Sequence, residues 1–202
     1  MKVVGLCGLI GAGKDTAGDI FVKYGYVRIS FASVLKDIVA MMFGWDRQMV
    51  EGSNPESRVQ RDVVDVYWSA VFKRDITPRN MLQTMGTEIM RDHLHTDIWV
   101  KIIEKRIRDK TYGDKVVLTD TRFPNECQMV HELGGQVVRI VRGPTPSWET
   151  QLEQTSLKDR LTIPGLPHCS EWAWIGHEDK SLSNNASVHD LETKLVEMFH
   201  LN

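Results

Sequence analysis

The stretch GLIGAGKDT, residues Gly8 to Thr16, decides the predicted fold. It has the G-x-x-x-x-G-K form of a phosphate-binding P-loop, between an apolar run at 3–7 that predicts a buried strand and a helical pattern at 15–23. The glycines let backbone N–H groups turn inward, the helix N-terminus adds positive potential, and Lys14 supplies a mobile charge for the β- and γ-phosphates of ATP. A glycine-rich turn that binds nothing is the alternative, and a lysine at this spacing argues against it.

One letter of the stretch departs from the general P-loop pattern. The residue after the lysine is usually Ser or Thr, whose hydroxyl binds magnesium, whereas this chain has Asp15, with Thr16 one place later. In one arrangement the Asp15 carboxylate is a direct magnesium ligand, and ATP binds poorly without the metal. In the competing arrangement Asp15 is turned away and paired to a neighbouring cation, and Thr16 serves the metal.

Composition sets the class of protein. The chain has 202 residues, enough for one domain or for one domain with an inserted lid. It is 42% hydrophobic and 26% charged, which is the ordinary range for soluble domains. A net charge of −2 gives no reason to expect a nucleic-acid partner, and no apolar run approaches membrane-spanning length. Neither a nucleic acid nor a membrane is therefore an expected partner, and the P-loop favours small-molecule nucleotides.

The cysteines and the N-terminus indicate an intracellular protein. Cys7, Cys127 and Cys169 are odd in number and form no C-x-x-C pair, which favours a reduced compartment. The chain opens directly into its first predicted strand, with no signal peptide ahead of it. His168 beside Cys169 is weak evidence for zinc, because no second pair of ligands has suitable spacing.

Strand and helix patterns alternate along most of the chain. Beyond the first strand and helix, strands are predicted at 26–31, 115–120, 136–142 and 180–185, and helices at 32–42, 78–91, 98–108, 124–133 and 188–199. Thr77 and Ser187 are the expected N-caps of two of these helices, with Pro78 at a first helical position. The alternation predicts an α/β fold of the P-loop NTPase type, a three-layer sandwich with a mostly parallel central sheet and helical lid or substrate insertions.

Two stretches lack this regularity. Residues 44–78 are turn-rich and polar with helical pieces, and residues 143–176 hold four of the seven prolines with little periodicity. We expect a single P-loop domain, residues 1–202, with mobile insertions at about 44–78 and 143–176.

Several polar residues fall where parallel strands end. The strand at 115–120 is expected beside the first strand, so that Asp120 faces the phosphates at the carboxyl edge of the sheet. Arg122 and Arg142 stand at the ends of two strands that we expect to be neighbours, and their forked guanidinium groups suit phosphates. A surface ion pair is the alternative for each arginine.

The helical segments supply further candidates. Ser33 and Lys36 lie in the first turn of the helix at 32–42, where a ligand at the sheet edge is within reach, although Lys36 fits a solvated surface position equally well. Trp99 either packs in the core, which is favoured, or stacks on a base. Gly86, inside the helix at 78–91, suggests close approach by a ligand or another backbone.

Ordered blocks of this sequence carry a family resemblance. They are residues 8–16 with the Lys-Asp-Thr end, 31–37, 82–91, 99–101, 120–126, 135–142, 168–171 and 184–185. Through most of its length the chain resembles the phage-type deoxynucleoside monophosphate kinases, a P-loop kinase family. It departs from them at Asn184-Asn185, where members often have Asn-Asp. The least similar regions, 44–78 and 143–167, are those expected to hold the lid and the substrate-selective surfaces.

The resemblance implies transfer of the γ-phosphate of ATP to a deoxynucleoside 5′-monophosphate, giving the diphosphate for DNA precursor synthesis. It implies Mg²⁺, the cytoplasm of a phage-infected bacterium and a homodimer. The implied residues are Lys14, Arg122 and Arg142 for catalysis; Gly11, Ala12, Gly13, Lys14, Asp15, Thr16 and Asn185 for ATP; Ser33, Lys36, Arg79, Arg91, Trp99, Asp120 and Glu171 for the acceptor; and Asp15, Thr16 and Asp120 for the metal, directly or through water.

Two other functions are weighed against this one. Another small-molecule kinase on the same fold, of the phosphomevalonate or dephospho-coenzyme A kinase type, shares the P-loop and lacks the nucleotide acceptor. A non-catalytic nucleotide switch or a motor ATPase belongs to a different class. Against the motor, the composition gives no basic surface, and Asp120 is followed by Thr121 rather than by a second acid.

Overall fold

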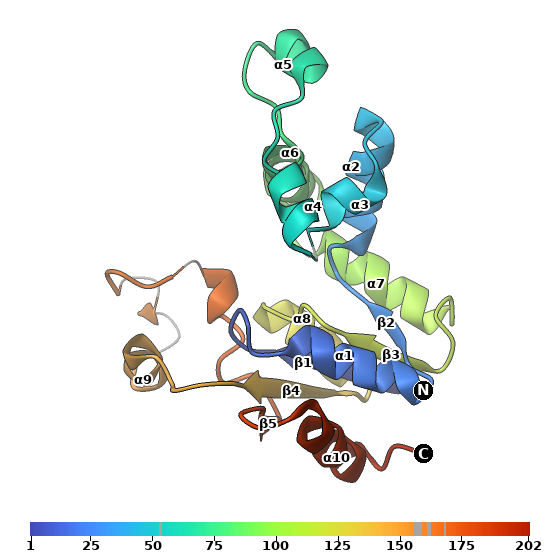
Figure 1. Ribbon diagram of the computed structural model, residues 1–202, viewed down its shortest axis with the longest axis vertical. Helices are drawn as coiled ribbons and strands as arrows, with labels where there is room; N and C mark the ends of the chain where they lie inside the picture. The colour runs from blue at the N-terminus through green and yellow to red at the C-terminus, as the bar shows by residue number, and fades with distance from the viewer. Residues whose placement is uncertain (53, 156–158, 161–162, 168) are drawn as a thin grey trace. The chain divides into compact units, whose positions relative to one another are not determined.

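The computed structural model describes residues 1–202 except 53, 156–158, 161–162 and 168. The chain forms two compact units (Figure 1). The first unit combines residues 1–30 with 104–202, and the second holds residues 31–103. The predicted organisation, a single domain with two mobile insertions, stays a prediction, and each unit is described by itself below.

The first unit is built on a parallel sheet. Its strands are β1 (Lys2–Cys7), β2 (Val27–Ile29), β3 (Lys115–Leu118), β4 (Gln136–Val141) and β5 (Lys180–Ser183), in the order β2-β3-β1-β4-β5. Every neighbouring pair is parallel. The predicted α/β class is confirmed, as is the place of β3 beside β1. The expectation that Arg122 and Arg142 follow neighbouring strands is wrong, because β1 lies between β3 and β4.

Helices cover the sheet on both faces. The helices of this unit are α1 (Lys14–Lys23), α8 (Pro124–Glu132), α9 (Ser147–Glu153) and α10 (Val188–Phe199), with a short 3-10 turn η3 (Cys169–Glu171). On one face, Phe21 of α1 and Leu195 of α10 pack with Leu6 of β1. On the other, the position of Gly5 in β1 faces Val130 of α8. These layers agree with the predicted sandwich.

The second unit is helical. It contains α2 (Ser33–Phe43), α3 (Arg47–Glu51), α4 (Pro55–Gln60), α5 (Val66–Phe72), α6 (Pro78–Gln83) and the π-helix η1 (Thr84–Leu94), and α7 (Ile98–Arg108) leads from it into the first unit. Its core joins Val39 and Phe43 of α2 to Val50 of α3 and Leu82 of α6. The helix α5 buries none of its residues.

Local signals explain most of the helix boundaries. Thr77 and Ser187 each form a capping box, and Pro78 occupies the first position of α6, as predicted. The predicted continuous α-helix over 78–91 is wrong from Thr84 onward, where the chain widens into η1. There the Gly86 carbonyl accepts a hydrogen bond from the Trp99 indole at 2.9 Å, which ties the widened turn to α7.

The two irregular stretches differ in how far their patterns predict their structure. Residues 44–78 hold α3, α4 and α5, which agrees with the helical pieces expected there. Residues 143–176 contain α9 and η3, neither of which was predicted. Cys7, Cys127 and Cys169 are free thiols, and Cys7 is buried as expected. Among the described residues, no helix combines the length and apolarity needed to cross a membrane.

Candidate active site

The P-loop connects the carboxyl end of β1 to the N-terminus of α1, and its glycines are required by geometry. Gly8 and Gly13 adopt φ angles of 132° and 98°, which side chains rarely tolerate. A Cβ on Gly8 would collide with the Ile140 carbonyl, and one on Gly13 would collide with the Asn184 amide. That amide donates to the Ala12 carbonyl at 2.9 Å. The loop is therefore held in shape from the ends of β4 and β5.

Lys14 is held against its own loop. Its Nζ donates to the carbonyls of Gly8 and Leu9 at 2.8 and 2.9 Å. Burial, with a further contribution from the Arg122 charge, lowers the pKa of Lys14 below its usual value, while Glu171 opposes the shift. The ammonium group thus sits inside the loop, where phosphates of a bound nucleotide would compete with the two carbonyls for it.

Asp15 is paired within the protein rather than free to face a ligand. Its carboxylate forms an ion pair with Arg28, which also bonds Asp19 at 2.8 Å, and the Asp15 side chain is 75% exposed. The pairing to a neighbouring cation is what the competing arrangement expects of Asp15. That Thr16 serves the metal stays a prediction. Sequence reasoning missed Arg28, although its place in the short second strand at the sheet edge was a usable signal.

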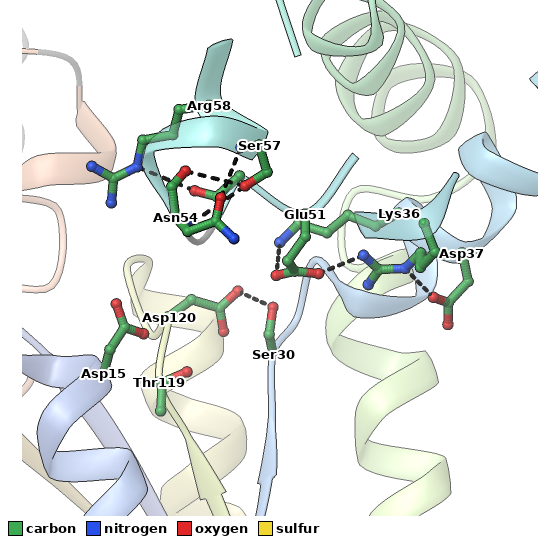
Figure 2. Close-up of polar contacts among 12 residues, drawn as sticks. Asp15, Ser30, Lys36, Asp37, Glu51, Asn54, Ser57, Arg58, Thr119 and Asp120 are labelled. Atoms are coloured by element: carbon green, nitrogen blue, oxygen red, sulfur yellow. Dashed lines mark hydrogen bonds and ion pairs between the residues drawn. The ribbon is translucent and has the colours of Figure 1, made fainter. Parts of the chain in front are cut away.

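Asp120 lies just beyond β3, at the carboxyl edge where the P-loop begins. Its Oδ2 accepts a hydrogen bond from the Ser30 hydroxyl at 2.7 Å, and Figure 2 shows this contact between the two strand ends. Ser30 is the first residue after β2 and Asp120 the second after β3, so the parallel pairing of these strands brings the two together. Sequence reasoning found Asp120 and missed Ser30.

Arg122 and Glu171 were predicted separately and meet in the structure. The Arg122 guanidinium bonds the Glu171 carboxylate at 3.4 Å, with side chains 44% and 26% exposed. The Arg122 backbone N–H donates to the buried Glu126 carboxylate at 2.7 Å, in the first turn of α8. The backbone is thereby fixed, while the side chain remains accessible to solvent.

Arg142 and Asn185 stand on the other side of β1. Arg142 is exposed directly after β4. The Asn185 Oδ1 accepts from the Gly143 backbone at 2.7 Å, joining the loops that follow β4 and β5. Asn184, beside it, makes the buried contact to the P-loop. Asn184, which sequence reasoning did not assign to the site, therefore supports the P-loop directly.

The remaining candidates belong to the second unit, where two of them form ion pairs. Lys36 bonds Glu51 at 2.6 Å, and Arg47 bonds the same carboxylate (Figure 2). Although burial pushes the other way, these two hydrogen bonds hold the pKa of Glu51 below its usual value. The Arg79 guanidinium donates hydrogen bonds to both carboxylate oxygens of Asp62.

The other three candidates of this unit lie on its helices. Ser33 opens α2, and Arg91 lies half-buried in η1. Trp99 is only 3% exposed, and its indole N–H is already bonded to the Gly86 carbonyl. Stacking Trp99 on a base would require unpacking this contact, so the structure favours the core role.

Comparison with known proteins identifies the family. The family described as deoxynucleotide monophosphate kinase matches residues 48–195. The chain belongs to this family. The resemblance inferred from the ordered sequence blocks is thereby confirmed.

Individual relatives agree with this assignment. A protein of Acanthamoeba polyphaga mimivirus that bears the family's name is 31% identical over 207 residues, covering 97% of this chain and 95% of the relative. The deoxynucleoside-5′-monophosphate kinase of Escherichia phage T5 is 32% identical over 118 residues, covering 58% of this chain and 42% of the relative. Among solved structures, a dephospho-CoA kinase from Campylobacter jejuni aligns with 99% of this chain and 96% of its own at a TM-score of 0.46 and 17% identity, too distant a likeness to bear on activity.

Proposed function

We propose that the chain transfers the γ-phosphoryl group of ATP to the 5′-phosphate of a deoxynucleoside monophosphate. The observation that carries this proposal is the gathering of Lys14, Asp120 and Arg122 at one edge of a parallel sheet, in a chain of the deoxynucleotide monophosphate kinase family. Phosphoryl transfer needs alignment and charge neutralisation more than covalent help from the protein.

The loop residues would hold ATP. Backbone N–H groups of Gly11, Ala12 and Gly13 are suited to the β-phosphate, and Lys14 to the β- and γ-phosphates. Because Lys14 bonds two loop carbonyls, it must exchange them for phosphate oxygens as ATP binds. Asn185 is proposed near the adenine.

The oxygen donors at this edge fit Mg²⁺. The metal prefers one or two carboxylates or hydroxyls together with substrate phosphates, so a full cage of protein ligands is not required. Within the described residues, no group of three or more His, Cys, Asp and Glu side chains is placed to hold a metal. The Thr16 hydroxyl and the Asp120 carboxylate would hold it, while Asp15 remains with Arg28. When bound, Mg²⁺ would neutralise charge on the β- and γ-phosphates.

The acceptor phosphate is proposed to meet Arg122. Its guanidinium is accessible, and its bond to Glu171 is long enough at 3.4 Å to be exchanged for a phosphate oxygen. Arg142, exposed beyond β4, would place its positive charge near the transferred phosphoryl group. Ser33, Lys36, Arg79 and Arg91 remain proposed acceptor contacts of the second unit. Action in the cytoplasm of an infected host and assembly as a homodimer are proposed from the family alone.

A coupled ADP-release assay with ATP and each common deoxynucleoside monophosphate tests the proposal. We expect ADP formation that depends on at least one of these acceptors and on magnesium. ADP formation only with dephospho-coenzyme A or a phosphorylated mevalonate would move the chain to another small-molecule kinase class. ATP binding with no acceptor-dependent turnover would favour the non-catalytic nucleotide switch.

A further inference from the structure

A buried carboxylate holds the backbone of Arg122. Glu126, the third residue of α8, is only 3% exposed. Its Oε2 accepts from the backbone N–H groups of Arg122 at 2.7 Å and of Phe123 at 3.2 Å. Burying a carboxylate is costly unless donors satisfy it, so the two amides and the carboxylate stabilise one another.

The geometry goes beyond that of an ordinary helix cap. At the third position of a helix, a glutamate commonly reaches back to the N–H of the N-cap residue, which is Phe123 in α8. Here the shorter of the two bonds goes to Arg122, one residue before the N-cap. Pro124 opens the helix and has no N–H, so Glu126 accepts both of the amides that lie between Thr121 and Pro124.

The two residues ahead of Arg122 are anchored by other contacts. Asp120 accepts its hydrogen bond, at 2.7 Å, from the residue that follows β2. Thr121 is buried, and a Cβ on Gly5 of β1 would meet its Oγ1 at 3.0 Å, which places Thr121 against the sheet. Glu126 therefore supplies the anchor at the next position, where the chain leaves the sheet edge and enters α8.

The backbone of Arg122 decides what its side chain can reach. The guanidinium is accessible and pairs with Glu171 at 3.4 Å. Burial is the first cause that lowers the pKa of Lys14 and the Arg122 charge is the second, so this charge acts on the P-loop lysine. An arginine side chain loses rotamer freedom when it binds a ligand, and a backbone that is fixed beforehand adds no further cost.

We propose that Glu126 is a positioning residue for phosphoryl transfer, because it fixes the backbone from which the Arg122 side chain reaches the acceptor phosphate. The proposal rests on the proposed function, in which Arg122 meets that phosphate. In this role Glu126 acts through Arg122 and makes no contact of its own with the substrates. A displacement of about 1 Å can lower a rate by roughly a hundredfold, so losing this support should be visible in the kinetics.

Glu126→Ala tests the proposal. With ATP saturating and the acceptor varied, kcat/KM for the acceptor should fall roughly ten- to a hundredfold, because Arg122 is no longer held in place. The KM for ATP should stay near that of wild type, since the P-loop is supported from the ends of β4 and β5. Glu126→Gln should keep most of the activity, because its side-chain carbonyl can accept the same two amides. Unchanged kcat/KM in Glu126→Ala would overturn the proposal.

Asp190→Ala is the matched control for a purely structural role. Asp190 is the third residue of α10, and its carboxylate accepts from the Ser187 backbone at 3.0 Å. Both variants lose the support of a helix start in the same unit and should melt below wild type. Only Glu126→Ala should lose kcat/KM for the acceptor. Equal kinetic losses in the two variants would overturn the proposal and make Glu126 a structural residue.

A double-mutant cycle separates the positioning of Arg122 from any other effect of Glu126. In an Arg122→Ala background, Glu126→Ala should cost little further kcat/KM, since the side chain that it positions is already gone. A full additional loss would overturn the proposal. If Glu126→Ala does not fold, Glu126→Asp takes its place in the same cycle, because its carboxylate is one methylene shorter and cannot reach both amides.

The same measurements distinguish this inference from the proposed function. If wild type forms the diphosphate and Glu126→Ala retains its kcat/KM for the acceptor, the inference fails alone. If wild type forms no diphosphate with any deoxynucleoside monophosphate, the proposed function fails, and the inference fails with it.

Discussion

The P-loop edge of the first unit and the end of α4 in the second unit, where Arg61 lies, differ in how the protein itself satisfies their charged groups. At the P-loop edge, Lys14 bonds loop carbonyls, Asp15 bonds Arg28, and Arg122 bonds Glu171. Arg61 has no such bond to any residue that the structure describes, and only the charges of Asp62 and Glu51 act on it favourably. Phosphate binding at the first region must therefore exchange existing partners, whereas the Arg61 Nε has no protein partner to exchange.

The difference concerns what a mutation leaves behind. Replacing a residue of the P-loop edge frees its protein partner, which can be hydrated where it is accessible and stays unsatisfied where it is buried. Replacing Arg61 frees no side-chain hydrogen-bond partner among the described residues. The predictions below test the first region, from the largest expected effect to the smallest.

Lys14→Ala should abolish phosphoryl transfer. The ammonium group neutralises charge that grows on the transferred phosphoryl, so turnover should fall by more than about a hundredfold. The melting temperature should stay near that of wild type, because the freed carbonyls of Gly8 and Leu9 can be hydrated. Lys23→Ala is the matched control, a lysine of the same helix paired at the surface with Glu192. Turnover of Lys14→Ala within a few fold of wild type in the coupled assay would refute the P-loop assignment.

Arg122→Lys should lower kcat/KM for the acceptor nearly as much as Arg122→Ala does. The ammonium group of lysine cannot replace a guanidinium group that donates to two phosphate oxygens at once. Both variants should therefore lose roughly ten- to a hundredfold in kcat/KM for the acceptor. Steady-state kinetics with varied acceptor and saturating ATP provide the measurement. Full activity of Arg122→Lys would show that Arg122 does not bind the acceptor through its fork.

Asn184→Ala should destabilise the first unit. The change leaves the buried Ala12 carbonyl without its donor, at a cost of about 1–3 kcal/mol. Thermal unfolding followed by circular dichroism should show a lower melting temperature than for Asn185→Ala, since Asn185 is exposed. Equal melting temperatures for the two variants would mean that the contact from Asn184 does not support the loop.

Asp15→Asn should have the smallest effect on the response to magnesium. If Asp15 serves as the ion-pair partner of Arg28, replacing its carboxylate with a neutral amide leaves the metal ligands intact. The gain in ATP affinity with magnesium is then retained. Calorimetric titration of ATP with and without magnesium checks this for wild type, Asp15→Asn and Thr16→Val. We expect only Thr16→Val to shrink the magnesium dependence. A smaller dependence in Asp15→Asn, caused by better metal-free binding, would make Asp15 a direct ligand.

The sequence predicts the P-loop edge well because its signals are local. The glycine spacing, the apolar strand at 3–7 and the carboxylate after the strand at 115–120 each lie within a few residues of the feature they predict. The capping boxes at Thr77 and Ser187 are local in the same sense, and both form as expected.

The contacts that the sequence did not reveal join distant segments. The bond from Arg28 to Asp15 depends on where β2 ends relative to α1, and the Ser30 bond depends on the pairing of β2 with β3. Arg61 carries no motif, and that its Nε is buried without a partner follows only from where the end of α4 meets Gly52. The expectation that Arg122 and Arg142 follow neighbouring strands is wrong because a β-strand pattern does not say which strands are neighbours.

The central claim is that the P-loop moves a phosphoryl group to a nucleotide acceptor. Phosphorus NMR of a reaction with ATP, magnesium and the preferred deoxynucleoside monophosphate follows donor and acceptor together. The account predicts that ADP and the deoxynucleoside diphosphate appear in equal amounts, and that neither appears with Lys14→Ala. ADP accompanied by inorganic phosphate instead of the diphosphate, or equal product formation by Lys14→Ala, would contradict it.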